Sequence, residues 1–157
     1  MSPTPPDIAQ LVARLERSMS EMTRSAAIRR FYQRLARAAG IELERPVYLA
    51  LKYLAHNGPE RISALAHQHG VEVSTMSRHV TTLEAAELVT KRPLPDDRRV
   101  AVAEATEAGR RVVERVEDER QRLFTEVLSD WELPDVEQLV GLIERFNAGL
   151  AERLEES

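Results

Sequence analysis

Three residues at fixed spacing, Ala66, Gly70 and Met76, constrain the fold of this chain more than any other feature. Where two helices are joined by a tight turn, a small residue lets the first approach the second, and Ala66 provides it. Four residues later, Gly70 permits the positive φ of a sharp turn at the least steric cost. Met76 then offers an apolar side chain that packs the second helix on the first. Residues 65–84 therefore predict a helix-turn-helix unit, although an ordinary helical hairpin fits the same spacing.

The spacing of apolar residues around this unit predicts a mainly helical chain. Residues three or four apart predict one long helix from Ile8 to Ala39, with Gly40 as its C-terminal cap. We expect Ser63 to cap the short helix before the turn. The same pattern predicts further helices over residues 46–56, 63–69 (the short helix before the turn), 74–87, 106–128 and 135–154.

Behind the helix-turn-helix, the pattern changes to two short β-prone runs, 89–92 and 100–103. The segment between them is rich in Pro, Asp and Arg, which predicts a hairpin with a loop longer than two residues. A charged hairpin in this place is typical of a wing. We therefore expect a single mainly α domain with a small β-hairpin wing. Its winged helix-turn-helix core spans about 43–105, and long dimerisation helices lie at about 7–40 and 106–155.

The charge of the chain is distributed unevenly. The net charge of −4 argues by itself against binding to nucleic acid. However, residues 1–103 carry 15 Lys and Arg against 11 Asp and Glu, whereas residues 104–157 carry 7 against 15. The first part can face phosphate while the second faces solvent or a partner. A merely solvated acidic surface explains the second part equally well.

The helices at the two ends of the chain have apolar stripes broader than the core of one chain obviously requires. Long terminal helices of this kind commonly pack against each other and against a second copy. We therefore favour a homodimer over a bundle formed within one chain.

The outward side chains of the second helix of the unit are candidates for reading DNA. They are short hydroxyls and one guanidinium, Arg78, which can bond a guanine edge through two N–H groups. In the hairpin, Asp97 can orient a neighbouring arginine by a charge-assisted hydrogen bond and leave other N–H groups for the minor groove. A solvated surface ion pair is the alternative. The candidate DNA-binding residues are Ser74, Thr75, Ser77, Arg78, Thr81, Thr82, Arg98 and Arg99.

These segments together resemble the MarR (multiple antibiotic resistance regulator) family. The matching stretches are LAHQHGVEVSTMSRHVTTLEAAELV, RPLPDDRR and TEAGRR, and the resemblance covers about residues 43–109. Within the wing, Asp97 and Arg99 fit the Asp-x-Arg pattern of the family. The resemblance implies a homodimer that binds double-stranded DNA at a palindromic promoter site, more often as a repressor. It also implies release of the DNA when a small molecule binds.

The resemblance places an effector pocket between the dimerisation region and the DNA-binding lobe. Aromatic and cationic side chains there suit a small aromatic or phenolic effector, although the same side chains fit an ordinary core equally well. The candidate pocket residues are Phe31, Tyr32, Arg34, Tyr48, Lys52 and Tyr53.

Two features depart from the family pattern. Glu87 stands where such sequences often have glycine. We therefore expect a differently shaped junction between the second helix of the unit, called the recognition helix, and the strand that follows it. His69 and His79 occupy positions that are often apolar. We expect them to be partly buried, in contact with each other, or turned toward phosphate.

The sequence contains no recognisable catalytic or metal-binding pattern. There is no cysteine, no strained nucleophile elbow, no phosphate-binding glycine loop and no dinucleotide fingerprint. His67 and His69 are two residues apart on a helix and therefore point in different directions. We expect no enzymatic activity, cofactor or metal, and the lack of an apolar span or secretory signal suggests a cytoplasmic protein without a membrane partner.

Two alternatives from other classes fit the same sequence. A winged helix that serves as a protein-interaction module would show no salt-dependent affinity for DNA. A small helical enzyme or ligand carrier would retain a cofactor on purification.

Overall fold

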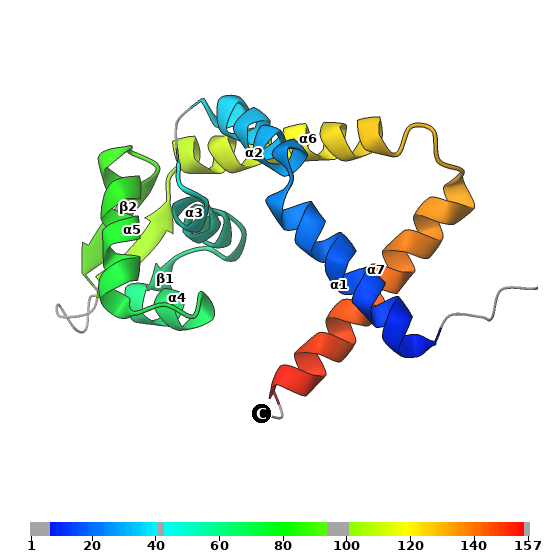
Figure 1. Cartoon of the computed structure of the whole chain (residues 1–157). Coiled ribbons are helices and arrows are strands. Elements are labelled where there is room, and N and C mark those ends of the chain that lie inside the picture. The colour runs from blue at the N-terminus through cyan, green and yellow to red at the C-terminus, as the bar shows by residue number, and fades with distance from the viewer. Residues whose placement is uncertain (1–6, 41–42, 94–100, 156–157) are drawn as a thin grey trace, which may run out of the picture. The chain divides into compact units, whose positions relative to one another are not determined.

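A computed structural model describes residues 7–40, 43–93 and 101–155 (Figure 1). The chain divides into two compact units, residues 1–119 and 120–157, and the boundary lies inside a long helix. The described elements confirm the expected class, mainly α with one small sheet. In chain order they are α1 (Ile8–Arg24), α2 (Ala26–Ala39), α3 (Arg45–Asn57), β1 (Glu60–Arg61), α4 (Ile62–Gln68), α5 (Val73–Ala85), β2 (Val89–Pro93), β3 (Ala101–Ala105), α6 (Glu107–Val127) and α7 (Leu133–Glu155).

The N-terminal segment forms two helices, so the prediction of one long helix over 8–39 is wrong. Ser25 lies between them with φ −65° and ψ 152°, and its Oγ accepts a hydrogen bond from the main-chain N–H of Ile28 at 3.1 Å. A serine in this geometry satisfies one of the free N–H groups at the start of α2, which stabilises a break at this residue. Gly40 ends α2 in the left-handed conformation, as expected.

The predicted hairpin is present as β2 and β3, which pair antiparallel with Val89 opposite Ala105 and Pro93 opposite Ala101. A third strand, β1, pairs with the other edge of β3 and was not predicted. Because β1 leads directly into α4 at Ile62, Ser63 lies inside the helix. The prediction that Ser63 caps α4 is therefore wrong, and Arg61 takes the cap position without a side-chain hydrogen bond.

An apolar core lies in the first unit. It draws on the second half of α2, on α3, α4, α5, the sheet and the first half of α6. In the helices it is built from side chains that the helical periodicity places on one face. The largest fully buried side chains are Leu51, Leu54, Leu65, Met76, Leu83, Val80, Val89 and Val113. This core fixes the positions of α5 and the hairpin, where the candidate DNA-binding residues lie.

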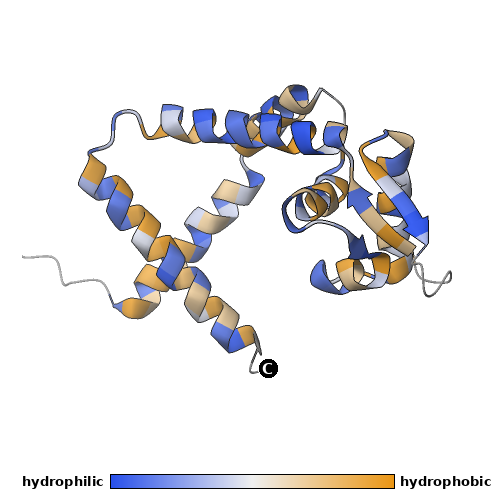
Figure 2. Cartoon of the chain, turned by 180° about the vertical axis from the view of Figure 1, so that it is seen from behind, coloured by the Kyte–Doolittle hydropathy of each residue, from blue (hydrophilic) through white to orange (hydrophobic). Residues whose placement is uncertain are grey.

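The helices at the two ends of the chain contribute little to any core. No residue of α1 is buried, and every residue of α7 from Leu133 to Leu154 is exposed or half-buried. Apolar and polar residues nevertheless alternate along α7 with helical spacing (Figure 2). Among the helices of the described residues, none is both long and apolar enough to cross a membrane.

Candidate nucleic-acid interface

The turn between α4 and α5 has the geometry that the spacing predicted. Gly70 has φ 61°, its N–H donates to the carbonyl of His67 at 3.1 Å, and the N–H of Val71 donates to the carbonyl of Ala66 at 3.0 Å. These two bonds form a Schellman motif, which ends a helix with a left-handed residue. A Cβ on Gly70 would meet nothing within 4 Å, so the backbone conformation and not space favours glycine here.

The helix after this turn, α5, separates its side chains into a buried and an exposed face. Met76, Val80 and Leu83 are buried, with exposures of 1%, 0% and 0%. The opposite face carries the predicted reading residues: Arg78 is exposed and forms no ion pair with any described residue. Among the hydroxyl side chains of the predicted set, those of Ser74, Thr81 and Thr82 are exposed, and those of Thr75 and Ser77 are half-buried.

The threonine hydroxyls on this face already use their protons. Thr81 Oγ1 donates to the carbonyl of Ser77 at 2.9 Å, and Thr82 Oγ1 donates to the carbonyl of Arg78 at 3.1 Å. Both lone pairs of Thr82 Oγ1 remain available, and one remains on Thr81 Oγ1, which also accepts a long hydrogen bond from Lys91 Nζ at 3.5 Å. These hydroxyls are therefore better suited to accept hydrogen bonds from base amino groups than to donate to phosphate. Arg78 provides the strongest free donor group on the described part of this helix face.

Lys91 of β2 connects the hairpin to the recognition helix. Its Nζ lies 2.9 Å from Glu84 Oε2 and 3.5 Å from Thr81 Oγ1. No local sequence pattern indicates this residue, because its partners Glu84 and Thr81 lie seven and ten positions away. The hairpin is further joined across its strands by an exposed ion pair between Arg92 and Glu104 at 3.3 Å. Asp97, Arg98 and Arg99 lie outside the described residues, and their roles stay predictions.

The junction between α5 and β2 differs from our expectation. Glu87 has φ 59°, the left-handed conformation that glycine would adopt, so the prediction of a differently shaped junction is wrong. The N–H of Glu87 donates to the carbonyl of Glu84 and that of Leu88 to the carbonyl of Leu83, both at 2.9 Å. This is a second Schellman motif, completed by the buried side chains of Leu83 and Leu88.

Three of the six candidate effector residues take part in two aromatic contacts. In α2, the rings of Phe31 and Tyr32 meet edge to face with centroids 5.5 Å apart, and the guanidinium of Arg45 lies 5.2 Å from the centre of the Tyr32 ring. In α3, the Tyr53 ring contacts the ring of His69 at 5.8 Å. The remaining aromatic candidate, Tyr48, is half-buried on α3.

The two cationic candidates pair with carboxylates of α6. Arg34 Nε pairs with Glu119 Oε1, and Lys52 Nζ lies 2.9 Å from Glu117 Oε1. His56 Nε2 lies 3.0 Å from the same oxygen. Burial raises the pKa of Glu117, but hydrogen bonds from Lys52 and His56 and their charges outweigh burial and hold the pKa below its ordinary value. These pairs tie α2 and α3 to α6 within the first unit.

The two unusual histidines are half-buried. His69 Nε2 and His79 Nδ1 are buried atoms that have no hydrogen-bond partner among the described residues. Burial, followed by the charge of His79, lowers the pKa of His69 below 6.5. The described residues contain no group of three or more His, Asp or Glu side chains placed to hold a metal ion.

The MarR family model matches residues 43–101 of this chain. A Bacillus subtilis protein described as the uncharacterized HTH-type transcriptional regulator YxaD is 32% identical over 105 residues, which cover 67% of this chain and 73% of YxaD. The crystal structure of the transcriptional regulator BldR from Sulfolobus solfataricus is 26% identical, covers 91% of this chain and 99% of its own, and has a TM-score of 0.67. A MepR-like protein complexed with pseudoligands is 27% identical, with coverages of 86% and 94% and a TM-score of 0.59.

Proposed function

Because this chain belongs to the MarR family of transcriptional regulators and has a DNA-binding winged helix fold, we propose that it is a homodimeric repressor of a palindromic promoter site. A small molecule that binds each subunit relieves the repression. The observation that carries the proposal is the outward face of α5, where Arg78 is exposed and has no ion-pair partner in the described part of the chain.

Recognition of bases follows from the chemistry of that face. A helix in the major groove presents the side chains near its N-terminal half to base edges. Arg78 donates two N–H groups to the O6 and N7 atoms of a guanine, and Thr81 and Thr82 accept from amino groups of cytosine or adenine. The wing arginines, Arg98 and Arg99, bind the neighbouring minor groove or its phosphates.

The apolar side chains that the terminal helices leave exposed support the proposal of a dimer. Along α1, Leu11, Leu15 and Met19 are 42%, 46% and 43% exposed, at the spacing of one helix face. A second copy of the chain that covers this face, and the corresponding face of α7, removes these side chains from water. The two copies then present two α5 helices to half-sites about one helical turn apart. The exposed apolar side chains of α7 are Leu133, Val140, Leu142, Ile143, Phe146, Leu150 and Leu154.

The effector binds at the candidate residues of α2 and α3, in competition with the carboxylates of α6. An aromatic carboxylate has the charge of Glu117 and Glu119, and it displaces one of them from Lys52 or Arg34. Loss of such a pair loosens α6 from α2 or α3. A neutral phenol leaves both pairs in place, so benzoate and phenol distinguish the two effector classes. Benzoate should lower DNA affinity in the wild type and have a weaker effect in Lys52→Met.

The proposal is tested by selecting duplexes from a random double-stranded pool with the wild-type protein. Arg78→Ala should weaken binding to the enriched duplex by about tenfold or more, since one bidentate contact to guanine is worth about 1–3 kcal/mol. Arg98→Ala and Arg99→Ala should weaken binding to many sequences and reduce its salt dependence. Arg17→Ala, which removes an exposed arginine of α1, is the matched control. Failure of the folded wild type to enrich any duplex would contradict the proposal.

A further inference from the structure

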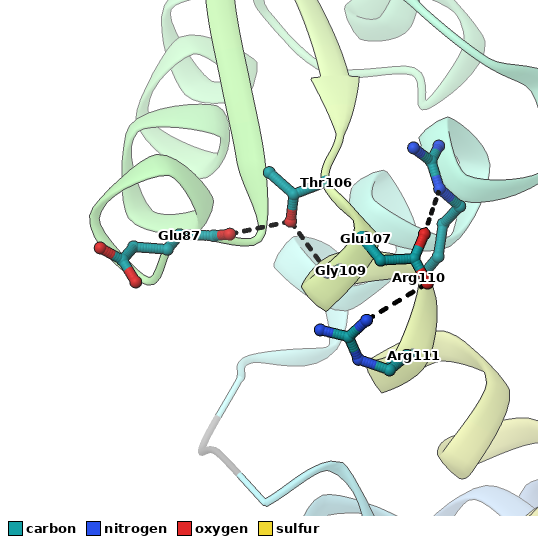
Figure 3. Close-up of polar contacts among 6 residues, drawn as sticks. All are labelled: Glu87, Thr106, Glu107, Gly109, Arg110 and Arg111. Atoms are coloured by element: carbon teal, nitrogen blue, oxygen red, sulfur yellow. Dashed lines mark hydrogen bonds and ion pairs between the residues drawn. The ribbon is translucent and has the colours of Figure 1, made fainter.

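The end of the recognition helix is joined to the start of α6 by one side chain. Thr106 immediately precedes α6, and its Oγ1 donates a hydrogen bond to the carbonyl of Glu87 at 2.8 Å (Figure 3). The same oxygen accepts a hydrogen bond from the N–H of Gly109 at 3.0 Å, which caps the first turn of α6. A hydroxyl has one proton, and the hydrogen bond to Glu87 uses it. The same oxygen can therefore only accept from Gly109, so the direction of both hydrogen bonds is fixed.

The backbone around this bridge leaves little freedom. The main-chain N–H of Thr106 donates to the carbonyl of Leu88 at 2.9 Å. A Cβ on Gly109 would lie 2.2 Å from that same carbonyl oxygen, so the first turn of α6 touches the backbone that ends the recognition helix. The carboxylate of Glu87 points away from the bridge, and only its main-chain carbonyl takes part (Figure 3). The contact therefore depends on the left-handed turn and not on the glutamate side chain.

We propose that Thr106 is a positioning residue that sets the angle between α5 and α6, and thereby the half-site spacing that the dimer accepts. This inference rests on the proposed function, because spacing has meaning only for a dimer that binds two half-sites. In a dimer held together by its terminal helices, the orientation of each recognition helix depends on the elements that connect the recognition helix to the terminal helices. The side chain of Thr106 contributes one donor and one acceptor to such a junction, beside the main-chain hydrogen bond to Leu88.

Three substitutions separate capping from positioning. Thr106→Ser keeps both hydrogen bonds. Thr106→Asp keeps an acceptor for Gly109, and therefore the cap, but an ionised carboxylate cannot donate to the carbonyl of Glu87. Thr106→Val loses both bonds. Thr125→Val is the matched control, because it removes a hydroxyl from α6 whose hydrogen bond goes to Gln121 within the same helix.

The experiment measures binding to the duplex selected by the wild type and to versions with one base pair inserted between, or deleted from between, the half-sites. The wild type, Thr106→Ser and Thr125→Val should discriminate against the altered spacings by about tenfold or more, because one base pair rotates a half-site around the helix axis. In Thr106→Asp the ratio of the affinity for the selected duplex to the affinity for the altered spacings should fall to about threefold or less, while the protein remains folded and dimeric. A uniform loss of affinity at all spacings, with the ratio unchanged, would overturn the positioning role.

The outcomes also distinguish this inference from the proposed function. If the wild type enriches no duplex, the proposed function fails and spacing is not at issue. If the wild type binds and discriminates spacing but folded Thr106→Asp does so equally, the inference about Thr106 alone fails. Should Thr106→Val not fold, Thr106→Asp still decides, because it retains the cap.

Discussion

Apolar side chains are buried in the winged helix-turn-helix part of the chain (the lobe, residues 43–93 and 101–105 as described) but remain exposed on the terminal helices α1 and α7. In the lobe, Leu51, Leu54 and Leu65 are 0% exposed. In α1, Leu11 and Leu15 stay more than 40% exposed, and no residue from Leu133 to Leu154 of α7 is buried. The lobe thus completes its core within one chain, whereas the terminal helices carry apolar surface that one chain leaves in contact with water.

This difference indicates that the two regions have separate roles, one in positioning α5 and the other in association. A core that is complete in one chain holds the candidate DNA-binding residues of α5 in fixed positions. Apolar surface left exposed on amphipathic helices favours association, because burying it stabilises a complex by about 25 cal/mol for each Å² removed from water. Substitutions in the lobe should therefore change folding, and substitutions in the terminal helices should change assembly.

The largest effect is expected in the core of the lobe. Leu65→Ala removes a fully buried side chain at the interface of α4 with the core and should lower the free energy of unfolding by about 2–5 kcal/mol. Leu49→Ala makes the same change in α3 at a side chain that is 39% exposed, and it should cost clearly less. Urea unfolding followed by circular dichroism, at one protein concentration, measures both. Equal losses would mean that burial in the lobe does not control its stability.

The next largest effect is expected in assembly. Leu142→Arg places a charge on the apolar face of α7 and should raise the dimer dissociation constant by about 100-fold or more, because an unpaired charge resists burial. Sedimentation at several concentrations measures the constant. Ala148→Arg introduces the same charge at an exposed position on the opposite side of α7 and serves as the control. A wild type that is monomeric at all concentrations would contradict the assignment of these helices to assembly.

The turn at the centre of the lobe was predictable because its causes are local. Ala66, Gly70 and Met76 stand at spacings that helix geometry and a positive φ require, and the structure confirms the turn between α4 and α5. The hairpin was predictable for the same reason, since a change of period and a cluster of turn residues lie next to each other in the sequence. Local chemistry also placed Thr106 at the start of α6, where its hydroxyl caps Gly109.

The features that were missed depend on partners far away in the sequence. The strand β1 has only two residues, too few for an alternating pattern, and it exists because Glu60 lies opposite Ala103. Lys52 and Glu117 are likewise 65 positions apart, and the pairing follows from the packing of α3 on α6. The break at Ser25 was missed for another reason: the apolar spacing continues through it, and one capping hydrogen bond decides the outcome.

A smaller effect is expected where two helices of the lobe end in the same conformation with different residues. Glu87→Gly should raise the free energy of unfolding by about 0.5–1 kcal/mol, because glycine adopts a left-handed φ without the penalty that a side chain carries. Gly70→Ala is the reverse experiment: its Cβ would have free space, so only the backbone strain acts, and stability should fall by about 1 kcal/mol. Thermal and urea unfolding measure both. Changes of the same sign would show that φ does not control these two turns.

The smallest effect is expected from acid, and it should again be confined to the lobe, where all four histidines lie. Burial, and then the charge of His79, lowers the pKa of His69, so below pH 6.5 the unfolded chain binds a proton that the folded lobe resists. The stability contributed by neutral His69 is thus fully present above pH 6.5 and is lost as the pH falls toward the lowered value. His69→Gln should flatten this part of the stability profile, whereas His67→Gln, at an exposed position of α4, should leave the loss in place. An identical acid loss in wild type and His69→Gln would exclude His69 as its source.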